Sequence, residues 1–120
     1  MNPSEEEIAV LIGDAQAPVY SLTIDAFLKF QLKRKVLGQG GTQTFLKQSR
    51  SLIQGIANEK MDDLCAVSVR YAKYELDTNP IFQKNFDEEP RAIVLADLVN
   101  ALKKLADEHI SAPAKAEADK

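Results

Sequence analysis

Residues 87–110, DEEPRAIVLADLVNALKKLADEHI, are the most regular amphipathic stretch of the chain. Acidic residues and Pro90 stand at its start, where the helix dipole favours negative charge and a proline breaks no hydrogen bond. Its apolar residues recur at helical spacing and form one stripe: Leu95, Leu98, Val99, Leu102, Leu105 and Ala106. The stretch therefore predicts a helix that ends near Ile110 and packs one face against a core.

The preceding region, residues 43–76, carries a similar apolar stripe. Thr42 or Thr44 is its expected N-cap. One long helix and two shorter helices both fit the stripe. Two are favoured because globular helices rarely exceed about 20 residues, and residues 58–60 are the expected break.

A short helical turn is predicted between these two regions. Asn79-Pro80 closes residues 43–76, because proline disfavours helical geometry in the residue before it. Phe82 and Phe86 are four positions apart, so a helical turn over 80–86 would present both rings to the core.

The N-terminal residues predict another short helix. Ser4 and Glu7 have the spacing of a capping box, and Gly13 is a natural stop. A helix of about eight residues is too short to be stable alone, so it must pack against a larger neighbour.

Residues 20–32 are the ambiguous part of the chain. Their apolar and polar residues alternate as in a strand, while a subset of the apolar residues also has helical spacing. Thr23 suits an N-cap, and three cations suit a last turn before Gly38: Lys33, Arg34 and Lys35. A helix over about 24–37 is favoured, and the strand is left open.

Together these segments predict an all-α fold, a small bundle of four to five helices formed by residues 1–110 as a single domain. Residues 111–120 have no apolar anchor and predict a disordered C-terminal tail. Phe30 and Leu37 lie off the main stripe of their helix. A helix that is apolar on more than one side is either central in a bundle or part of an interface.

The 120 residues have a formal net charge of −3 that is unevenly distributed. Residues 1–18 carry −4, residues 19–60 carry +5 and residues 61–120 carry −4. The basic middle suits an anionic partner or the acidic ends of the same chain. No long apolar run and no secretory signal are present, so we expect a soluble cytoplasmic protein without a membrane anchor.

Side chains suited to catalysis or metal binding are scarce. Cys65 and His109 are the only residues of their types, which excludes a zinc site of four nitrogen and sulfur ligands. Cys65 falls on an apolar stripe and His109 in the last turn of a helix, where packing and capping explain them. We therefore expect no cofactor, no metal and no enzymatic activity.

Nucleic-acid binding through residues 33–54 is the alternative function. The Gly38–Thr42 turn opens a helix, which suits an anion, although it lacks the Walker and dinucleotide-binding fingerprints. The candidate side chains for phosphates and base edges are Lys33, Arg34, Lys35, Lys47, Gln48, Arg50 and Gln54. The acidic net charge argues against this function, because DNA-binding domains are usually basic.

Protein–protein interaction, with another protein or with a second copy of the chain, is the favoured function. The candidate interface residues are Phe30, Leu37, Tyr71 and Tyr74. Aromatic residues beside cations are common in interfaces, whereas the competing interpretation is that both tyrosines complete the core. An adaptor, an assembly factor or chaperone, or an immunity-type inhibitor would fit this pattern.

Part of the sequence resembles the small tail-assembly chaperones of tailed phages. The features are the run from Asp62-Asp63-Leu64 to Asn79-Pro80, the final amphipathic helix and the Ala/Pro/Glu tail. The resemblance covers about half of the chain and implies an assembly factor. It assigns no functional residue to a position in this sequence.

Overall fold

The computed structural model describes residues 2–33 and 40–118, without the side chains of residues 40, 41 and 112–118. Its elements are α1 (Glu5–Ile12), α2 (Ala17–Lys33), α3 (Gly40–Leu52), a 3₁₀ turn η1 (Asn58–Lys60), α4 (Met61–Thr78), α5 (Pro80–Asn85) and α6 (Glu88–Ala118). The described residues contain six α-helices and no strand, which confirms the predicted all-α bundle.

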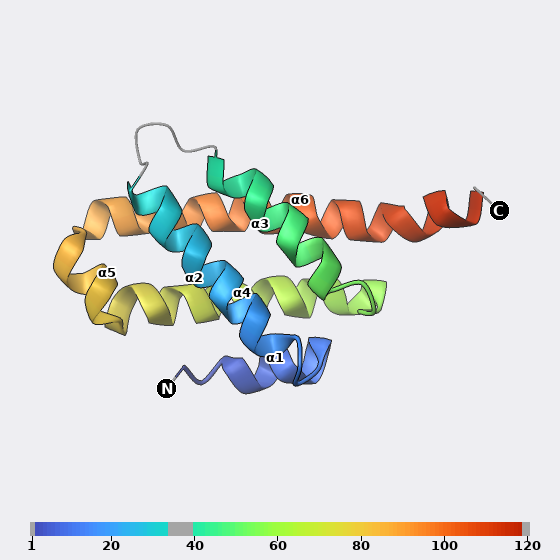
Figure 1. The fold of residues 1–120 in the computed structure, drawn as a ribbon, viewed down its shortest axis with the longest axis horizontal. Coiled ribbons are helices and arrows are strands. Elements are labelled where there is room, and N and C mark those ends of the chain that lie inside the picture. The colour runs from blue at the N-terminus through green and yellow to red at the C-terminus, as the bar shows by residue number, and fades with distance from the viewer. Residues whose placement is uncertain (1, 34–39, 119–120) are drawn as a thin grey trace.

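The helices form two layers around one core (Figure 1). The pair α2 and α3 crosses the pair α4 and α6, the short α5 joins α4 to α6, and α1 packs against α2 and α4. All six helices and the connection after α3 contribute large, fully buried side chains: Ile8, Tyr20, Ile24, Leu28, Leu32, Phe45, Ile53, Met61, Leu64, Leu76, Phe82 and Leu98.

Residues 20–32 are helical, so the strand alternative is wrong. Their buried apolar residues have helical spacing, and this pattern prevails over the alternation. The expected start was also wrong: α2 begins at Ala17, and Thr23 lies inside it, with its hydroxyl donating to the Val19 carbonyl oxygen at 2.8 Å. Such a bond to the preceding turn replaces the predicted cap. The expected end of the helix at Leu37 lies outside the described residues.

Residues 43–76 form two helices, as predicted, but the break between them spans residues 53–60 and is wider than the expected 58–60, which form η1. Ile53 and Ile56 are buried in the connection, so the apolar stripe continues where the helix does not. Neither Thr42 nor Thr44 is an N-cap, because α3 already begins at Gly40.

The predicted helical turn after Asn79 is α5. The Asn79 side chain caps it by accepting a hydrogen bond from the Ile81 N–H at 3.0 Å. Phe82 is fully buried, while Phe86 ends the helix in extended geometry and is half-buried.

The packed part of α6 ends near the expected position, since Leu105 is its last buried residue and Ile110 is 48% exposed. The helical backbone itself continues to Ala118, beyond the predicted end near Ile110. Alanine, lysine and glutamate, which dominate this extension, are favourable helix formers. The predicted tail, 111–120, begins on this extension beyond the core.

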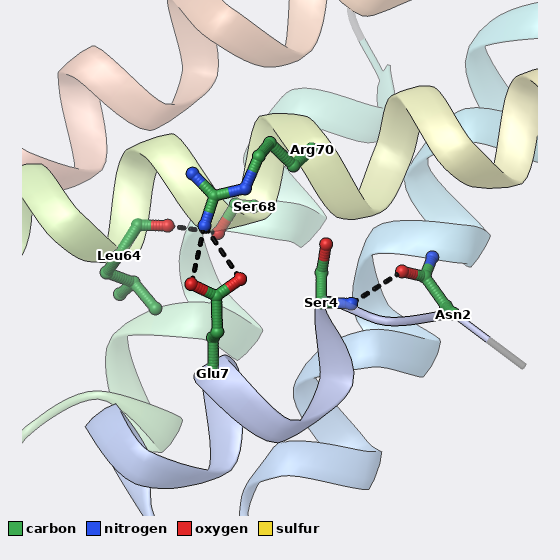
Figure 2. Close-up of polar contacts among 6 residues, drawn as sticks. All are labelled: Asn2, Ser4, Glu7, Leu64, Ser68 and Arg70. Atoms are coloured by element: carbon green, nitrogen blue, oxygen red, sulfur yellow. Dashed lines mark hydrogen bonds and ion pairs between the residues drawn. The ribbon is translucent and has the colours of Figure 1, made fainter.

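The N-terminal capping box does not form. Ser4 has helical dihedral angles (φ −76°, ψ −14°), whereas a capping side chain needs an extended backbone. Asn2 takes over instead: its amide donates to the Tyr71 carbonyl oxygen at 2.9 Å, and its side-chain oxygen accepts from the Ser4 N–H at 3.0 Å. Glu7 forms a two-bond ion pair with Arg70 of α4 (Figure 2).

Candidate interaction surface

The outer face of α2 is apolar, although its inner face already supplies the core. Leu22 is 67% exposed, Val19 48% and Phe30 38%. With Ala26, these residues recur at intervals of three and four positions, so they share one face of the helix. No other described helix exposes three large apolar side chains. The prediction that this helix is apolar on more than one side holds for its described residues.

A groove runs between this face of α2 and the neighbouring helix α3. Two adjoining cavities of about 420 and 120 Å³ share Thr23, Ala26 and Gln48. We define the α2–α3 groove by six of the lining residues: Val19, Leu22, Ala26 and Phe30 from α2, and Gln48 and Leu52 from α3. At its base the rings of Phe27 and Phe45 are in tilted contact, with centroids 5.3 Å apart. The base is therefore well packed.

Three exposed lysines flank the groove and form its basic rim: Lys29, Lys33 and Lys47. On α2, Lys33 lies three positions after Phe30 and Lys29 three positions after Ala26, and on α3 Lys47 lies one helical turn from Ser51, which lines the groove. The described residues of α3 include no acid. The groove thus combines an apolar surface with positive charge at its α2 C-terminal end.

An acidic pocket lies at the other end of α2. It has a volume of about 570 Å³, and Leu22 lines both this pocket and the groove. Its acidic residues come from α1, the α1–α2 turn, α2 and α4: Glu5, Glu6, Asp14, Asp25 and Glu75. The outer face of α2 therefore runs from a negative environment to a positive one.

Asp25 is the most perturbed carboxyl group in this pocket. Burial, reinforced by the negative charge of Glu75, raises the pKa of Asp25 to about 6. The Tyr71 hydroxyl donates to Asp25 Oδ2 at 3.1 Å and acts in the opposite direction. Burial and the nearby carboxylates raise the pKa of Tyr71 above its ordinary value, so its hydroxyl keeps its proton.

The predicted interface residues have different environments. Phe30 lies on the groove, whereas Tyr71 is 3% exposed and Tyr74 is half-buried. For Tyr71 the competing interpretation, a tyrosine that completes the core, describes the structure. Leu37 lies outside the described residues.

The predicted nucleic-acid residues are only partly gathered at one place. Lys33 and Lys47 belong to the basic rim, and Gln48 lines the groove. Arg50 is bound to the protein itself, since its Nε lies 3.5 Å from Glu108 of α6 and donates to the Leu46 carbonyl oxygen. Gln54 is exposed after the end of α3. Arg34 and Lys35 lie outside the described residues, as do Gly38 and Gln39, whereas the last three residues of the Gly38–Thr42 turn begin α3.

Val19 and Leu22 were missed by the sequence analysis. The helix was expected to begin at residue 24, which placed both residues before it. Had the helical spacing been extended backwards from Phe30 through Ala26, it would have included them.

Cys65 and His109 contact separate backbone carbonyls. Cys65 Sγ lies 3.7 Å from the Leu102 carbonyl oxygen, and burial raises the pKa of its thiol, which disfavours the reactive thiolate. His109 Nε2 lies 2.8 Å from the Ile56 carbonyl oxygen and links α6 to the connection after α3. Both contacts join parts of the bundle.

Residues 2–33 and 40–118 contain no group of three or more His, Cys, Asp or Glu side chains arranged to hold a metal ion. Within the same ranges, no helix is both long and apolar enough to cross a membrane.

No protein-family model, curated protein or solved structure matches this chain. The resemblance to phage tail-assembly chaperones accordingly rests on the sequence features alone.

Proposed function

We propose that this chain is a non-catalytic cytoplasmic protein that binds another protein molecule through the α2–α3 groove. The observation that carries the proposal is the exposure of Val19, Leu22 and Phe30 on one face of a single helix. Contiguous apolar surface of this kind is costly in water and marks binding sites on many proteins.

The shape of the surface favours a helix as the bound element. The groove lies between two helices, and its apolar positions on α2 follow helical spacing, as in grooves that receive an amphipathic helix. An adaptor, an assembly factor or an immunity-type inhibitor would each use such a groove, and the proposal covers all three.

Site-specific cross-linking tests this proposal. A photoreactive residue replaces Leu22 in the groove or, as a control, Ile81 on α5, which is 47% exposed. We expect position 22 to form discrete adducts in the host cell and position 81 to form none of them. The adduct partner is then purified, and its binding to wild type and Leu22→Glu is compared by calorimetry. Equal affinities for the two proteins would overturn the proposal.

Nucleic-acid binding is the second candidate because Lys29 and Lys33 are exposed on α2 and Lys47 is exposed on the neighbouring α3. Titration with duplex and single-stranded DNA at low and physiological salt tests it. A salt-dependent shift that Lys33→Glu weakens and Leu22→Glu leaves unchanged would favour this candidate. The absence of a shift at low salt would exclude it.

A further inference from the structure

We infer that the partner bound by the α2–α3 groove is a second copy of this chain, with α2 of one protomer antiparallel to α2 of the other. This inference rests on the proposed function and names its partner. It follows from the order of charges and side-chain sizes along the outer face of α2.

The charges on this face are complementary to themselves. The N-terminal end of α2 lies beside the acidic pocket, with Glu6 and Asp14 exposed, and the C-terminal end carries Lys29 and Lys33. In an antiparallel pair, the acidic end of each protomer meets the basic end of the other, and two-fold symmetry forms each contact twice. A parallel pair would place like charges together.

The apolar residues match in the same arrangement. A two-fold axis between Thr23 and Ala26 places Val19 of one protomer opposite Phe30 of the other. Leu22 of one protomer then lies beside Ala26 of the other, so a large side chain packs against a small one. Lys33 of one protomer lies opposite a position that is within one helical turn of Asp14 of the other. This register pairs the apolar positions with each other and the two ends with opposite charge.

Other occupants match only part of this surface. A nucleic acid or an acidic peptide would neutralise Lys29 and Lys33, but it would bring negative charge towards Glu6 and Asp14. A basic peptide would neutralise Glu6 and Asp14, but it would bring positive charge towards Lys29 and Lys33. A second copy complements both ends at once.

The full-length chain in sedimentation equilibrium provides the test. We expect a reversible dimer that weakens as the salt concentration rises, because the end contacts are solvent-exposed ion pairs. Leu22→Glu should weaken dimerisation at least 100-fold, since it puts a charge on each side of an apolar contact. Ile81→Glu on α5 is the matched control and should leave the dimer unchanged.

Charge reversal tests the register. Lys33→Glu and Asp14→Lys should each weaken the dimer roughly tenfold, because each removes two symmetric surface ion pairs. The double variant restores both pairs with opposite polarity, so it should recover most of the wild-type affinity. Circular dichroism checks that every variant keeps its helices. Single reversals without effect, or a double variant no stronger than the singles, would overturn the antiparallel register.

The two proposals fail in different ways. A wild-type chain that stays monomeric at several hundred micromolar in low salt overturns the dimer. If position 22 still cross-links to a different protein, and Leu22→Glu weakens that complex, the proposed function stands without the dimer. If wild type is dimeric and Leu22→Glu does not affect the dimer, the groove is not the contact and the inference is wrong.

Discussion

The two faces of α2 have similar apolar residues and opposite environments. Ile24 and Leu28 are fully buried on the inner face, whereas Leu22 on the outer face is 67% exposed. The inner face is completed by α4 and α6, whereas on the outer face α3 borders the groove and leaves Val19 and Leu22 about half or more exposed. The spacing of apolar residues therefore shows which faces of a helix are apolar. Only the fold shows which of these faces is buried by other helices of the chain.

The largest expected loss of stability comes from truncating a buried side chain on the inner face. Leu28→Ala should lower the free energy of unfolding by about 3 kcal/mol, because it removes a fully buried side chain and leaves a cavity. Urea denaturation followed by circular dichroism measures it. A loss below about 1 kcal/mol would mean that the inner face is loosely packed, and the contrast between the faces would disappear.

A smaller loss of stability is expected from removal of a buried hydrogen bond on the inner face. Tyr20 is fully buried, and its hydroxyl lies 2.6 Å from Ser68 Oγ, which also bonds to the Leu64 carbonyl oxygen. Tyr20→Phe keeps the ring and removes this bond, so we expect a loss of about 1 kcal/mol. Denaturant titration checks it, with Tyr74→Phe as the half-buried control. Equal effects of the two substitutions would contradict the assignment.

Asp25 lies at the border of the two faces and predicts a pH dependence. Its pKa is about 6 in the folded chain against an ordinary value of 3.8, so folding favours the protonated form. Its contribution to stability is therefore greatest below about pH 4 and is lost as the pH rises through 6. Because the site is partly exposed, we expect a loss of only about 1 kcal/mol.

Asp25→Asn should flatten this part of the stability profile, measured by thermal melts between pH 4 and pH 8. Asp77→Asn is the control, because Asp77 is an exposed residue paired with Lys73. In wild type, the negative charges of Glu75 and Glu5 should oppose ionisation of Asp25, and the positive charge of Lys29 should partly offset their effect on its pKa. An unchanged profile in Asp25→Asn would show that another group titrates.

The smallest effect is expected on the outer face. Leu22→Ser should change the unfolding free energy by less than about 0.5 kcal/mol, because the side chain is mostly in water in the isolated chain. Urea denaturation measures it, at a protein concentration low enough for sedimentation to show the chain as a monomer. A loss comparable to that of Leu28→Ala would mean that Leu22 belongs to the core of the single chain.

The sequence predicted features that depend on local periodicity. The all-α class, the division of residues 43–76 into two helices and the short helix after Asn79 follow from helical spacing, ordinary helix length and proline geometry, and the structure confirms all three. These signals lie within a few residues of the elements that they define.

Features that depend on distant residues were missed. Ser4 and Glu7 match a capping box, but Glu7 pairs with Arg70, which is 63 positions away. One local signal was also missed: Pro18 stands in the first turn of α2, as Pro90 does in α6, and the groove depends on this earlier start. The Tyr71–Asp25 contact likewise joins two helices whose proximity only the folded chain establishes.

The single thiol allows the motion between two helices of the bundle to be measured. Cys65 is the only cysteine, and its Sγ contacts the Leu102 carbonyl oxygen across the contact between α4 and α6. Because Cys65 is only half-buried, a thiol reagent labels it faster whenever those helices move apart, and the denaturant dependence of the labelling rate reports this local opening. Comparison of this rate with global unfolding would show whether the two helices separate independently of the rest of the domain.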